Sequence, residues 1–73
     1  MSTADWEARL REVKDRIGKV EWSVKAETTA LLALMTAGAD TTEAKQRLCR
    51  AQGVLADLRR QQRTLETMKQ AKP

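Results

Sequence analysis

Residues 6–24 read WEARLREVKDRIGKVEWSV, and an apolar side chain recurs among them at alternating intervals of four and three. This is the spacing of a coiled-coil seam, in which one apolar stripe of an α-helix faces a second helix. The same rhythm runs from Ala44 to Leu65, after an interruption at residues 37–40, Ala-Gly-Ala-Asp. The sequence therefore predicts an all-α fold, an antiparallel, coiled-coil-like hairpin of two helices.

The expected hairpin is a single domain that covers residues 1–73. Its first helix spans about residues 3–37, a turn follows over 38–41, and the second helix spans about 42–70. Gly38 should end the first helix, because glycine enters the left-handed conformation of a helix C-terminus without steric cost. Asp40 with Glu43 resembles a capping box for the second helix, with aspartate in place of serine or threonine.

The two seams should form the core and the oligomerisation surface. The residues expected there are Leu10, Val13, Ile17, Val20, Val24, Leu31, Leu34, Leu48, Leu55, Leu58 and Leu65. A turn centred near residue 39 places Val24 opposite Leu55 and Val13 opposite Leu65. A hairpin has only one layer of side chains between its helices, so we expect a second copy to cover it. The predicted assembly is a homodimer that forms a four-helix bundle.

Polar side chains interrupt the pattern at two seam positions, Glu27 and Gln62. Such residues usually restrict register or oligomeric state at some cost in stability. Alternatively, Glu27 receives a basic group from a partner. Cys49, beside the seam, is expected to be a small half-buried side chain without chemistry of its own.

Charged residues on the polar faces pair an acid with a base four positions later, which stabilises a helix. The expected pairs are Glu7–Arg11, Glu12–Arg16, Asp15–Lys19, Glu21–Lys25 and Glu43–Arg47. Most of these charges are therefore interpreted as part of the scaffold.

Several classes of function are disfavoured by composition. The chain has one cysteine and no histidine or tyrosine, and its three glycines are isolated, so we expect no metal site, no cofactor, no small-molecule substrate and no enzymatic activity. The apolar run over residues 30–35 is far shorter than the roughly 20 residues that cross a bilayer. Early acidic residues are unlike a secretory signal, which predicts a cytoplasmic protein.

The preferred functional hypothesis is a protein-interaction module, an inhibitor, adaptor or co-chaperone that lays a helical face on a partner protein. Trp22 is its marker, because its heptad position points away from the seam. The partner-binding residues predicted with it are Lys19, Lys25, Ala26 and Glu27. Alternatively, Trp22 lies in the interface with the second copy, or it is an exposed side chain without a binding role.

A nucleic-acid-binding regulator is the alternative hypothesis. Residues 37–73 carry eight basic side chains against four acidic ones, so the net charge of +4 belongs to the second helix. The residues proposed for phosphate contact are Arg50, Arg59, Arg60 and Arg63. That helix contains no aromatic residue for base stacking, which weighs against this alternative.

By size and architecture alone, the chain is similar to small helical hairpins of bacteria and phages that act as inhibitors or secretion co-chaperones. This likeness implies a bacterial, phage or mobile-element origin and a regulatory role through protein contact. It rests on general shape, since fold by itself does not specify function.

Overall fold

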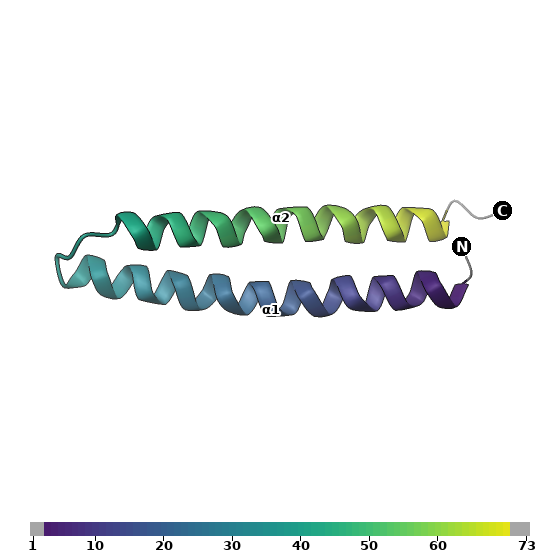
Figure 1. The fold of residues 1–73 in the computed structure, drawn as a ribbon, viewed down its shortest axis with the longest axis horizontal. Helices are drawn as coiled ribbons and strands as arrows, with labels where there is room; N and C mark the ends of the chain where they lie inside the picture. Colours follow the sequence, from purple (N-terminus) through teal and green to yellow (C-terminus); the bar gives the residue numbers. More distant parts are fainter. Residues whose placement is uncertain (1–2, 71–73) are drawn as a thin grey trace.

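The structure is a computed structural model that describes residues 3–70, with the side chains of residues 3–68. Two helices, α1 (Thr3–Thr36) and α2 (Thr42–Gln70), run antiparallel and side by side (Figure 1). The predicted helical hairpin is confirmed, and each end of the two helices lies within one residue of its expected position. The long axis of the rod measures 57 Å, against 15 and 13 Å across.

Gly38 ends α1 in the way that the sequence predicts. Its φ angle is +70°, and it is the only residue of the described chain with a positive φ. The amide of Ala39 donates to the carbonyl of Leu34 at 3.0 Å, and the amide of Gly38 donates to that of Met35 at 3.1 Å. This pair of bonds is a Schellman motif, which satisfies carbonyls that the helix end leaves without partners.

Asp40 starts α2, but not through the predicted capping box. Its Oδ1 accepts hydrogen bonds from the amide of Thr42 at 3.0 Å and from the Thr42 hydroxyl at 2.8 Å. Glu43 does not reach back to Asp40. Its carboxylate instead pairs with Arg47 one turn later, at 3.2 Å. These two hydrogen bonds, followed by the attraction of Lys45, lower the pKa of Asp40 from its ordinary value of 3.8.

The side chains between the helices are those of the seam, and the core they form is thin. The buried hydrophobic residues are Val13, Ala44, Leu55, Leu58 and Leu65. The other seam side chains, from Trp6 to Leu34 on α1 and at positions 48, 51 and 62 on α2, are half-buried. No described side chain is completely buried. The polar Gln62 gains a partner on its own helix, because its amide donates to Glu66 at 3.0 Å.

Among the described residues, a hydrogen bond and an ion pair of side chains join the two helices. The indole Nε1 of Trp6 donates to the carbonyl of Leu65 at 2.7 Å, near the open end of the hairpin. Farther along the rod, Arg59 meets Glu21 at 3.2 Å. Glu21 therefore contacts α2 and not Lys25, its expected neighbour on α1. Of the other predicted pairs, Asp15–Lys19 forms at 3.2 Å. The pairs Glu7–Arg11 and Glu12–Arg16 do not form.

Candidate functional site

Among the described residues, Trp22 is the most exposed large apolar side chain, with 73% of its surface accessible. Its position in α1 lies opposite the seam, so neither helix packs against the ring. The Nζ atom of Lys25 lies over the indole, 5.7 Å from the ring centroid, within the range of a cation–π contact. The ring is thus held beside a positive charge and offers an open face to solvent.

The neighbours of Trp22 are small or flexible. Ala26 is exposed one turn away, and a Cβ added to Gly18 would meet no atom within 4 Å. Lys19 is held by Asp15 at 3.2 Å, with both side chains mostly exposed. A partner surface can therefore approach the ring closely. We call the group of Trp22, Lys19, Lys25 and Ala26 the tryptophan surface.

Glu27 does not lie on the tryptophan surface. It follows Trp22 by five positions, which places it about 140° away around the helix, in the seam. It is half-buried there, and no hydrogen bond or ion pair of its carboxylate occurs in the part of the chain that the structure describes. Arg47, which is close to it in the predicted register, is engaged by Glu43. The structure thus brings together four of the five predicted partner-binding residues.

The four arginines of the nucleic-acid hypothesis do not share one face of α2. Arg50 and Arg59 lie about 180° apart around the helix. Arg59 is engaged by Glu21 at 3.2 Å, and Arg60 pairs with Asp57 at 3.3 Å. The set is therefore spread around the helix and partly neutralised, with Arg63 about 40° from Arg59 and about 60° from Arg60.

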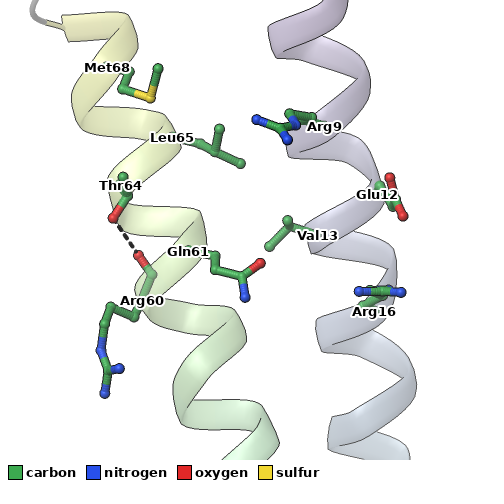
Figure 2. A pocket seen from close by; sticks show the side chains of 9 residues that line it. All are labelled: Arg9, Glu12, Val13, Arg16, Arg60, Gln61, Thr64, Leu65 and Met68. Atoms are coloured by element: carbon green, nitrogen blue, oxygen red, sulfur yellow. Dashed lines mark hydrogen bonds between the residues drawn. The ribbon is translucent and has the colours of Figure 1, made fainter.

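Arg60 does line a groove, which is not among the sites predicted from the sequence. This groove has a volume of about 420 Å³ and lies on one flank of the hairpin, near its open end. Figure 2 shows Arg9 and Val13 of α1 directed toward Gln61 and Leu65 of α2. The full lining is Arg9, Glu12, Val13, Arg16, Arg60, Gln61, Thr64, Leu65 and Met68. An adjoining hollow is lined by Arg60, Arg63, Thr64, Thr67 and Met68.

The sequence carries a signal for this groove, although the same residues also predict an ion pair within α1. Arg9 and Arg16 are seven residues apart, at the same heptad position, directly beside the seam. The Glu12–Arg16 pairing expected at this point assigned Arg16 to the scaffold. In the structure that ion pair is absent, and both side chains line the groove.

The described residues contain no metal-binding cluster, and their one cysteine lies on the surface. Within residues 3–68, no group of three or more histidine, cysteine or acidic side chains is placed to hold a metal ion. Cys49 is a free thiol and is exposed, so the expectation that it is half-buried is wrong. It follows the seam residue Leu48 by one position, and this turns its side chain out of the interface.

Across the described helices, no segment is long and apolar enough to cross a membrane. Comparison with family models, with curated proteins and with solved structures gives no match. The function proposed below is therefore based on the surfaces of the hairpin.

Proposed function

We propose that the hairpin is a small, non-enzymatic protein-interaction module that acts as an inhibitor, adaptor or co-chaperone by laying the tryptophan surface on a partner protein. The observation that supports this function is the 73% exposure of Trp22 on the outward face of α1. Tryptophan is among the residues most enriched at the energetic centres of interfaces, where a large ring fills a pocket on the partner. Packing within the hairpin does not require an indole at this position.

The lysines indicate the chemistry of the partner. Lys25 lies over the ring and Lys19 stands on the neighbouring turn, so the apolar centre of the surface has a positive rim. A complementary partner offers an apolar pocket with acidic residues at its edge. Rim charges of this kind mainly raise the association rate and make it depend on salt.

The test compares Trp22→Ala with Val54→Ala, which truncates another exposed apolar side chain on the other helix (49% exposed). The wild type and both variants are each immobilised and incubated with a cell lysate. The proteins that each one captures are then identified by mass spectrometry. The partner of the tryptophan surface should be a protein that the wild type and Val54→Ala capture and that Trp22→Ala does not. Its affinity should then fall about thirtyfold or more in Trp22→Ala, which corresponds to about 2 kcal/mol. Equal binding by all three proteins contradicts the proposal.

We also propose that a second copy of the chain covers part of the hairpin, giving a homodimeric four-helix bundle. The support is the surface area, since the chain exposes 5727 Å², whereas a compact monomer of its mass exposes about 4,500 Å². Exposed apolar side chains near the turn, Leu32 and Met35, contribute to the excess. A dimer would withdraw such surface from water.

Sedimentation equilibrium tests this assembly and should give about twice the chain mass of 8.2 kDa. The tryptophan surface should stay free in the dimer, so Trp22→Ala should sediment like the wild type. Dissociation of that variant to monomers would instead assign Trp22 to the contact between copies. A fully helical wild-type monomer at micromolar concentration contradicts the dimer.

A further inference from the structure

The flank groove near the open end of the hairpin combines a positive rim with an apolar floor. Arg9 and Arg16 come from α1 and Arg60 from α2, while Glu12 is the only acidic residue of the lining. Val13 and Leu65 form the floor, and both are buried, at 8% exposure. Met68 lines the groove one turn beyond Leu65 and is 45% exposed.

The arginines of this rim are largely free to bind an anion. Arg60 alone has a carboxylate partner in the described chain, Asp57, and that pair is mostly solvent-exposed. Arg9 and Arg16 have no acidic side chain within ion-pair distance among the described residues, and the same holds for Arg63 in the adjoining hollow. These arginines come from both helices, with Arg9 and Arg16 on α1 and Arg60 and Arg63 on α2.

We propose that this groove is a second protein-binding site, which docks an acidic amphipathic helix of a partner protein. A furrow between two antiparallel helices accepts a third helix, because ridges of side chains pack into such grooves at 8–10 Å between axes. The partner's apolar stripe would cover Met68 and the floor. Its glutamates or aspartates would pair with Arg9 and Arg16 on one side and with Arg63 on the other.

The charge of the groove argues against a second copy of this chain as its occupant. In a two-fold dimer formed through this flank, the same surface of both copies would meet, and arginines would face arginines. Like charges opposed across an interface cost several kcal/mol. The opposite flank, lined by Glu7, Arg11 and Lys14 with the apolar Trp6 and Leu10, has a more balanced charge and suits self-association better.

Nucleic acid fits the groove less well than an acidic helix does. The floor is apolar and contributes nothing to phosphate binding, and the lining contains no aromatic ring on which a base could stack. Glu12 on the rim repels a phosphate and an acidic side chain alike, so it does not discriminate between the two ligands. Met68 therefore distinguishes the two ligand classes, since only the helix would make use of it.

The experiment measures binding of a labelled synthetic peptide by fluorescence anisotropy. The peptide has three heptads with leucine at positions a and d and glutamate at e and g, so that repulsion between its own glutamates keeps it monomeric. Three control probes are compared with this peptide. The first has lysine in place of the glutamates, the second has serine in place of the leucines, and the third is single-stranded DNA of equal charge. The acidic leucine peptide should bind the wild type at least about tenfold more tightly than any of the other three probes.

Two matched double variants locate the site on the hairpin. Arg9→Gln with Arg16→Gln removes two charges from the groove, and Arg11→Gln with Lys14→Gln removes two from the opposite flank of the same helix. The first should weaken peptide binding about tenfold and the second less than about threefold. Met68→Ser should also weaken it without any change in net charge. All of these positions are exposed, and circular dichroism verifies that the variants stay helical.

The proposal is overturned if the acidic peptide does not bind, or if both double variants lose affinity equally. Tighter binding of the DNA, with no effect of Met68→Ser, would assign the groove to nucleic acid. Loss of peptide binding on dimerisation would assign it to the second copy. Trp22→Ala should leave peptide binding unchanged, so this site and the tryptophan surface succeed or fail separately.

Discussion

Glu21 and Arg59 are 38 residues apart in the chain, and their side chains meet across the hairpin at 3.2 Å. Both are about half exposed, at 51% and 56%. Exposed ion pairs contribute little, because water and salt screen the attraction and two long side chains must be ordered. A double-mutant cycle with Glu21→Gln and Arg59→Gln should give a coupling of about 0.2–1 kcal/mol that shrinks in high salt. A larger, salt-independent coupling would contradict this view of the pair.

Leu55 and Val54 are adjacent in α2 but occupy different environments, being 8% and 49% exposed. Leu55→Asp should unfold the hairpin, because an unpaired charge in the seam costs several kcal/mol. Val54→Asp introduces the same charge one position away and should leave the helical signal in circular dichroism intact. If both variants remain folded, or both unfold, the seam is misassigned.

Gly38 and Gly53 predict opposite responses to alanine. Gly38 has a φ of +70°, so Gly38→Ala should destabilise the hairpin by about 1–2 kcal/mol. Gly53 lies inside α2, where an added Cβ meets no atom within 4 Å, so Gly53→Ala should stabilise it by about 0.5–1 kcal/mol. Urea unfolding measures both free energies. The same sign for the two changes would be incompatible with the observed turn.

The contribution of Asp40 to the stability of the hairpin depends on pH. Because its pKa is lowered in the folded hairpin, the ionised side chain stabilises the fold above its ordinary pKa of 3.8, and this contribution is lost as the pH falls through the lowered value. Asp40→Asn keeps a hydrogen-bond acceptor and should flatten the fall in Tm between about pH 5 and pH 2. An unchanged acid profile would show that Asp40 does not contribute to it.

Glu27 is a carboxylate in the seam without an ion-pair partner among the described residues. Glu27→Leu should therefore maintain or raise Tm, since an apolar side chain suits this position better. Sedimentation should at the same time show a changed distribution of oligomers, if the polar residue restricts the assembly. Strong destabilisation would mean that Glu27 has a partner in the assembled protein.

Most of the fold could be predicted from local signals. The seam rests on a period that only an α-helix produces, and Gly38 is the one residue between the two seams that tolerates a left-handed backbone. The register follows from these two facts, and the Glu21–Arg59 contact agrees with it.

The candidate sites are less predictable from the sequence, because a surface side chain can form alternative contacts whose interaction free energies are similar. Lys25 on the same helix and Arg59 on the other compete for Glu21, and each pair contributes only a fraction of a kcal/mol. Arg9 and Arg16 are more than 50 positions away from Met68 in the sequence. They line the same groove as Met68 only because the two helices pack together. The heptad position of Trp22 predicted its exposure, since that position depends on its own helix alone.

The hydrogen bond between Trp6 and Leu65 spans 59 residues of chain, whereas the turn joins the helices within a few. Closing a long loop costs more entropy than closing a short one, so pairing of the helices starts most cheaply at the turn and proceeds outward like a zipper. The flank groove belongs to the last section to close. A partner that binds both α1 and α2 there would stabilise the open end of the hairpin, which is the end that would otherwise unfold first.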